Sequence, residues 1–228
     1  MSVLDPVVEA PRERPEVLRI GGPALPPPPD DSDGDGWGRE PSREPRGFDN
    51  LRLGVLVFIG AESMFFATLI SALFVLRLGI AAWPPPLEPR LPVVLTGINT
   101  LVLLASSVGV AAAMRALRRG ERRPLVRRLG IAAVLGTLFL AVQGSEWIRL
   151  VGFGLTIASG VYGLTFYTLI GFHALHVFGA LVWLSTTAAL VANGRLGARR
   201  AAPVKACAMY WHFVVGLWPI LYVAVYLL

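Results

Sequence analysis

Five long apolar segments, separated by short polar loops, dominate the chain. They cover roughly residues 52–78, 92–116, 127–149, 160–193 and 205–228. Each is long enough to cross a hydrocarbon core, which needs a helix of about 20 residues. A chain that crosses lipid must satisfy its own backbone hydrogen bonds, and the short alternating segments typical of a β-barrel do not occur. The pattern therefore predicts an all-α, polytopic membrane protein with five transmembrane helices.

The sequence before the first apolar segment has a different composition. Residues 1–50 hold eleven of the fifteen acidic residues and include the run PPPPDDSDGDG at 26–36. Such a segment has too little apolar mass to offset the entropy lost on ordering. We therefore expect a disordered, Pro- and acid-rich tail at 1–50, followed by a transmembrane domain at 51–228.

The basic residues predict how the chain is oriented in the membrane. Eighteen of the twenty-one Lys and Arg residues lie in or beside the tail and the loops at 115–128 and 193–205. Cytoplasmic loops carry the excess of Lys and Arg, so we place these segments and the N-terminus in the cytoplasm and the C-terminus outside. The net charge of +6 is thus a topology signal and does not indicate nucleic-acid binding. The same loops could also meet anionic lipid headgroups.

Polar side chains within the spans are the candidates for function, because a charge at membrane depth is costly and usually faces protein. Glu62 lies roughly 15 Å into the first span and His212 roughly 10 Å into the last, counted from the same side, so they share a level if these helices pack together. No basic residue of its own helix is near Glu62, so we expect its carboxyl to donate a hydrogen bond to a neighbouring helix or lipid. The five ionisable candidates are Glu62, Glu146, His173, His176 and His212.

The stretch GFHALHV at 171–177 places His173 and His176 three residues apart, on one face of a helix. This spacing fits a shared metal ion, a proton relay, or hydrogen bonds to a neighbouring helix. Metal sites in helix bundles gather several carboxylates and histidines, and only Glu62 and His212 could join this pair. Cys207 is the only cysteine, which excludes a cysteine cluster. We therefore favour hydrogen bonding between helices and expect no bound metal.

Small and aromatic residues complete the pattern. Ser106 and Ser107 in the second span indicate close helix packing, which small side chains allow in lipid. Tyr210 and Trp211 in the last span are expected near the membrane interface, where amphipathic aromatic rings gather.

Six stretches, in this order, resemble subunit III of the haem–copper terminal oxidases. They are AESMFFATLISALF (61–74), WPPP (83–86), INTLVLLASSVGV (98–110), LGTLFLAVQGSEW (135–147), YGLTFYTLIGFHALHVFGAL (162–181) and CAMYWHFVVGLWPILYVAVY (207–226). Together they cover nearly all of residues 52–228. The chain resembles the five-helix form, which occurs among bacterial quinol oxidases and some cytochrome c oxidases.

The resemblance implies a subunit without a catalytic centre, haem or copper of its own. It would join catalytic subunit I and subunit II of a proton-pumping oxidase in a bacterial cytoplasmic (inner) membrane, with a periplasmic C-terminus. There it would stabilise the catalytic subunit, hold phospholipids and support proton uptake during aerobic respiration. The electron donor stays open between cytochrome c, which we favour, and quinol. The rival interpretation is a free-standing small transporter or channel in which Glu62 and the histidines relay protons.

The resemblance also implies an arrangement and a set of positions. The first two helices would form one bundle and the last three another, around a V-shaped cleft that holds phospholipids. Family positions fall on Glu62, Glu146, His173, His176 and His212, which with Trp211 become structural, lipid-contact or proton-linked candidates. The family often has an aspartate soon after the Y-W-H-F motif, where this chain has Val214 and Val215, so no role of that aspartate carries over.

Overall fold

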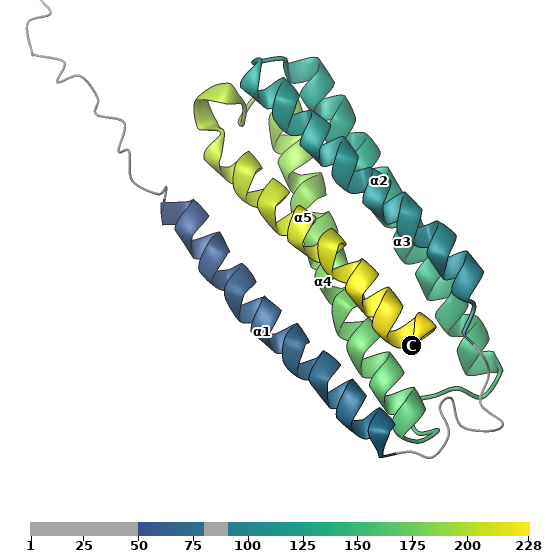
Figure 1. Cartoon of the computed structure of the whole chain (residues 1–228). Helices are drawn as coiled ribbons and strands as arrows, with labels where there is room; N and C mark the ends of the chain where they lie inside the picture. Colours follow the sequence, from purple (N-terminus) through teal and green to yellow (C-terminus); the bar gives the residue numbers. More distant parts are fainter. Residues whose placement is uncertain (1–49, 80–90) are drawn as a thin grey trace, which may run out of the picture. The chain divides into compact units, whose positions relative to one another are not determined.

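A computed structural model describes residues 50–79 and 91–228, and within these ranges the ordered elements are helical with no strand. The long helices are α1 (Asn50–Leu78), α2 (Val93–Arg118), α3 (Arg122–Gly152), α4 (Val161–Ala192) and α5 (Ala202–Tyr222). A 3₁₀ turn, η1 (Ala198–Arg200), precedes α5, and a π-helical turn, η2 (Val223–Leu227), continues it (Figure 1). The predicted tail lies outside the described residues, apart from Asn50.

All five long helices have the length and hydropathy to span a membrane, which confirms the predicted all-α, multi-pass class. The largest difference in helix bounds is at α3, which begins at Arg122 and not near residue 127. Arginine is a good helix former, and Pro124 is tolerated because the first turn leaves its N–H groups without helical acceptors anyway. The basic loop therefore contributes an extra turn of helix beyond the apolar segment.

Helices α4 and α5 form the middle of the described domain. α1 packs against α5 and, less extensively, against α4. On the opposite side, α2 and α3 pack against each other, and α2 also contacts α5 while α3 contacts α4 (Figure 1). The expected division into the first two helices and the last three is therefore wrong. A three-residue turn at 119–121, with Gly120 at φ 71°, makes α2 and α3 antiparallel neighbours. The longer connection between Leu78 and Val93 imposes no such pairing on α1 and α2.

Apolar side chains cover much of the outside of this domain. On α1, the side chains of Val57, Met64, Val75 and Leu78 are between 67% and 88% exposed. A water-soluble protein would not leave such a continuous surface bare. Lipid tails, or the apolar surface of another membrane protein, suit it equally well.

Polar side chains of α2 receive hydrogen bonds from the two buried tryptophans of α5. Nε1 of Trp211 donates to Oγ of Ser106 at 3.2 Å, and Nε1 of Trp218 donates to Oγ1 of Thr100 at 2.8 Å. The tryptophans are seven residues apart, two turns of helix, and their acceptors are six apart in the opposite direction. These bonds fix the register of two antiparallel helices, since an unpaired indole N–H is costly away from water.

Candidate functional site

The closest contact between ionisable groups inside the spans joins α1 to α4. Oε2 of Glu62 lies 2.8 Å from Nε2 of His176, and each side chain is 16% exposed. The distance is that of an ion pair, although the contact lacks the geometry of a well-formed hydrogen bond. The rings of Phe65 and Phe66 lie 6.3 and 5.1 Å from the His176 ring, so the pair sits against an aromatic surface. Glu62 therefore has a basic partner on another helix, which its own helix does not provide.

The second nitrogen of His176 limits the protonation states of this pair. Nδ1 lies 2.6 Å from the carbonyl oxygen of Phe172, and a carbonyl can only accept, so Nδ1 carries a hydrogen and donates. In a neutral ring Nε2 then has a lone pair, which would repel a carboxylate at this distance. The Glu62 carboxyl therefore faces Nε2, the ring nitrogen that the carbonyl of Phe172 leaves available for a contact across to α1.

His173 shares Phe66 with His176 but otherwise has different surroundings. Its fully buried ring stacks on Trp218 of α5, with ring centres 5.0 Å apart and an interplanar angle of 26°, and meets Phe66 edge-on at 6.2 Å. Neither ring nitrogen has a hydrogen-bond partner within the described residues. The two histidines of GFHALHV thus contact different neighbours, Trp218 and Glu62.

His212 lies on α5 but does not reach Glu62. Its Nδ1 is 2.5 Å from Oγ of Ser107 on α2, and the side chain is half-buried. The expectation that Glu62 and His212 share a level depended on α1 packing against α5, and these helices do pack together. The carboxyl of Glu62 nevertheless contacts His176 of α4, and His212 contacts Ser107 of α2.

The remaining two candidates are structural in their contacts. Trp211, grouped with the interface aromatics by the sequence, is 1% exposed and packs inside the domain against Ser106 and Gly136. Glu146 is buried near the end of α3, and its Oε1 accepts a hydrogen bond from Nη1 of Arg149 at 3.0 Å. Within the described ranges, no group of three or more His, Cys, Asp and Glu side chains is placed to hold a metal.

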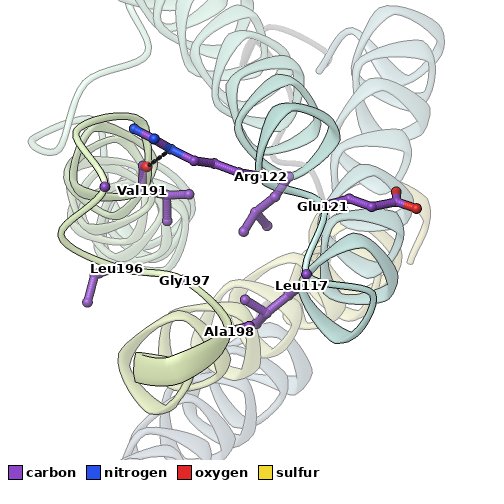
Figure 2. A pocket seen from close by; sticks show the side chains of 10 residues that line it. Leu117, Glu121, Arg122, Val191, Leu196, Gly197 and Ala198 are labelled. Atoms are coloured by element: carbon purple, nitrogen blue, oxygen red, sulfur yellow. Dashed lines mark hydrogen bonds between the residues drawn. The ribbon is translucent and has the colours of Figure 1, made fainter.

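A small pocket near the α2–α3 turn is closed by an arginine (Figure 2). It has a volume of about 190 Å³, and Arg122 reaches across it to the C-terminal end of α4. Nε of Arg122 donates to the carbonyl of Val191 at 3.0 Å, and Nη2 donates to the carbonyl of Ala192. The carbonyl of Val191 also accepts a hydrogen bond from the backbone N–H of Gly194 at 3.0 Å. A cationic side chain at this helix C-terminus stabilises the helix end, because the helix dipole is negative there. The pocket is thus part of a structural link between α3 and α4.

Sequence reasoning missed several of the polar contacts that tie the helices together. Ser106 and Ser107 were interpreted only as small packing residues, yet their hydroxyls bind Trp211 and His212. The side-chain amide of Asn99 donates to the carbonyl of Phe139 at 3.0 Å, and that of Gln143 to the hydroxyl of Tyr226 at 3.1 Å. A polar side chain within an apolar span was the available signal, since it needs a partner in lipid.

These features define a multi-pass helical membrane protein in which most of the ionisable side chains inside the spans contact polar groups of its own chain. The family profile of cytochrome c oxidase subunit III matches residues 44–228, which include all five helices. The chain belongs to the cytochrome c oxidase subunit III family.

Individual relatives agree with this assignment. Cytochrome c oxidase subunit 3 of Synechocystis sp. (strain ATCC 27184 / PCC 6803 / Kazusa) is 38% identical over 184 residues, which are 80% of this chain and 78% of the relative. The proteins of the same name from Oryctolagus cuniculus and Sus scrofa are 35% and 34% identical, each over 182 residues. In both comparisons the match covers 77% of this chain and 69% of the relative.

Proposed function

We propose that this chain is the non-catalytic third subunit of a proton-pumping haem–copper oxidase, with cytochrome c as the favoured electron donor. The observation that carries the proposal is the family match, which extends without a break over all five membrane-spanning helices. The haem and copper of such a complex belong to its catalytic subunit. Several polar side chains of this chain, Thr100 and Ser106 among them, bind side chains of a neighbouring helix and serve the architecture of the subunit.

The proposed partners are subunits I and II of the oxidase, together with phospholipids. α1 supports this role, because it packs on the domain through only part of its surface and exposes large apolar side chains along its length. Such a surface fits the membrane-buried face of a larger apolar chain or a layer of lipid tails. A subunit that covers its partner in this way would stabilise it and retain lipids at the contact.

We propose the Glu62–His176 pair chiefly as a structural link between α1 and α4, with a proton-linked role as the alternative. The carboxyl and the imidazole, two groups that can exchange a proton, lie 2.8 Å apart between α1 and α4. The alternative rests on this proximity, because a histidine beside a carboxyl is suited to proton transfer. The same contact also joins α1 to α4, so its structural and proton-linked roles are separable only by substitution.

We further propose a bacterial cytoplasmic membrane location, with the N-terminus in the cytoplasm and the C-terminus outside. Arg115, Arg118 and Arg119 at the end of α2 support this orientation, as do the basic residues at the start of α3 and around η1. These helix ends lie on the same side as the start of α1, and positive charge concentrates on the cytoplasmic side.

Purification tests the proposal against a free-standing transporter. The full chain, with an affinity tag at its N-terminus, is isolated from membranes in a mild detergent, and the untagged chain passes over the same resin as the control. We expect haem absorbance in the visible spectrum and a much larger apolar chain to elute with the tagged protein. A colourless homo-oligomer that transports protons or solutes in vesicles would instead support the transporter and refute the proposal.

A further inference from the structure

Tyr210 of α5 lies where α1, α4 and α5 meet, as does the Glu62–His176 contact. Its ring centre is 5.5 Å from that of Phe58 on α1 and 5.7 Å from that of Trp183 on α4. The residue is buried, with an exposed fraction of 7%. The proposed function assigns no role to this tyrosine.

The two ring contacts place Tyr210 beside the Glu62–His176 pair. Phe58 lies one helical turn before Glu62, on the same face of α1. Trp183 lies two turns after His176 on α4, which runs opposite to α1 (Figure 1). Both neighbours of Tyr210 are therefore displaced from the pair in the same direction along the helices. The Tyr210 hydroxyl also interacts electrostatically with the Glu62 carboxyl.

A hydroxyl at this position needs a hydrogen-bond partner. Phenylalanine would make the same ring contacts, whereas the O–H group of tyrosine loses water on burial and is costly without a partner. Within the described residues, the hydroxyl of Tyr210 has no direct hydrogen bond. The contact of Oε2 of Glu62 with His176 leaves Oε1 of the same carboxyl as an acceptor. A water molecule can bridge two polar groups that lie beyond direct reach.

We propose that Tyr210 is a positioning residue for Glu62. Its O–H group supplies the hydrogen bond for Oε1 of the carboxyl, and this holds Oε2 toward Nε2 of His176. The inference rests on the proposed structural link between α1 and α4, and it adds a third helix, α5, to that link.

The surroundings of Tyr210 favour Glu62 over other partners for the hydroxyl. Phe213, the ring neighbour of Tyr210 on its own helix, offers no acceptor side chain. Among the described residues of the spans, the other carboxyl is that of Glu146, which has its own basic partner near the end of α3. Tyr210 also lies eight residues, roughly 12 Å, along α5 from its start at Ala202, which is far from the headgroups at that helix end.

A double-mutant cycle tests the inference in the full chain, purified from membranes in mild detergent with the partners that it retains. Tyr210→Phe keeps the ring and removes the hydroxyl. We expect it to lower the ratio of folded to unfolded chain near the thermal midpoint about 5-fold, the effect of one average hydrogen bond. In the Glu62→Leu background the same change should have no effect, because the carboxyl that the hydroxyl orients is gone.

Infrared spectroscopy adds a measurement that reports on the carboxyl itself. The Glu62 band is identified by its loss in Glu62→Gln, and it should shift in Tyr210→Phe because the carboxyl loses a hydrogen-bond donor. The matched control is Tyr167→Phe, which removes a hydroxyl bonded to the carbonyl of Leu155 at 2.8 Å. Tyr167 is nine residues, roughly 13 Å, from His176 along α4. The control should therefore leave the band in place and destabilise both backgrounds equally.

An unshifted Glu62 band in Tyr210→Phe overturns the inference, and so do equal effects of this change in the parent and in Glu62→Leu. An equal band shift in the Tyr167→Phe control would overturn it as well, since the shift would then report general loosening. Failure of the proposed function has different signs: no haem co-purifies, or Glu62→Leu alone leaves stability unchanged. The infrared band tests Tyr210 in either case.

Discussion

Glu62 and His176 stabilise each other in a region where an isolated charge would be costly. Each side chain is 16% exposed, and the carbonyl of Phe172 fixes Nδ1 of His176 as a donor. The contact atom Nε2 can therefore accept a hydrogen bond whenever the ring is neutral. A replacement for Glu62 preserves the contact only if it brings a donor to this nitrogen.

This requirement separates two substitutions at position 62. The side-chain amide of Glu62→Gln can donate to Nε2 of His176, so we expect an assembled complex with normal haem spectra and oxygen consumption like that of the parent. Glu62→Leu leaves Nε2 without a partner, and we expect it to weaken attachment of the subunit by about 1–3 kcal/mol. The measurement is the fraction of this chain that stays with the complex as temperature rises.

Met64→Leu provides the control for the leucine variant, because Met64 is on the same helix and 75% exposed. It should behave like the parent. Slower proton uptake or altered pumping in an assembled Glu62→Gln complex would favour the proton-linked role over the purely structural one. Complete loss of oxygen reduction in that complex would contradict both roles, since it would place an obligatory chemical step on this chain.

At the scale of elements, the close contact between α3 and α5 depends on a glycine of α3. Gly136 of α3 is buried, and a Cβ added there would lie 2.6 Å from Cη2 and 3.1 Å from Cζ2 of Trp211. The indole of Trp211 is itself held by its bond to Ser106 of α2. Glycine at this one position allows three helices to meet around the same ring.

We therefore expect Gly136→Ala to destabilise the helix packing by about 1–3 kcal/mol, because the indole or the helix must shift to admit the methyl group. The measurement is the thermal unfolding midpoint of the detergent-solubilised subunit, followed by tryptophan fluorescence. Gly144→Ala is the matched control on the same helix, where an added Cβ meets nothing within 4 Å. It should leave the midpoint unchanged or raise it slightly. Equal midpoints for the two variants would show that Trp211 does not depend on this close approach.

At the scale of the whole molecule, the sequence predicts depth along each helix far better than rotation about its axis. The apolar segments predicted five helices with small errors at their ends, and Glu62 and His176 both fall near the middle of their spans. The contact between Glu62 and His176 was not predicted, because the depth of Glu62 in the membrane does not indicate whether its side chain points toward α4 or toward α5. The sequence likewise did not show that the indole of Trp211 faces Ser106 inside the domain.

The arrangement of helices was likewise only partly predictable. The short α2–α3 turn identifies these helices as neighbours by its length, yet the family resemblance placed the second helix with the first. Close contacts at Gly97 and Gly136 depend on side chains from α5, Tyr222 and Trp211, that no local pattern connects to them. Packing partners distant in sequence are determined by the fit of many side chains at once, which a single sequence does not reveal.

The last prediction concerns the segment before α1, for which composition favours a disordered tail. Deleting residues 1–40 leaves the whole family-matched range 44–228 and keeps Arg43, Arg46 and Arg52, the basic residues nearest the first span. Orientation should persist, since these charges stay on the cytoplasmic side of the first helix. We therefore expect the truncated chain to join the complex with unchanged haem content and subunit ratio, measured by visible spectroscopy and quantitative gel analysis after purification through a tag on the catalytic subunit. A truncated chain that inserts in the membrane but fails to join the complex would show that the tail carries a docking contact.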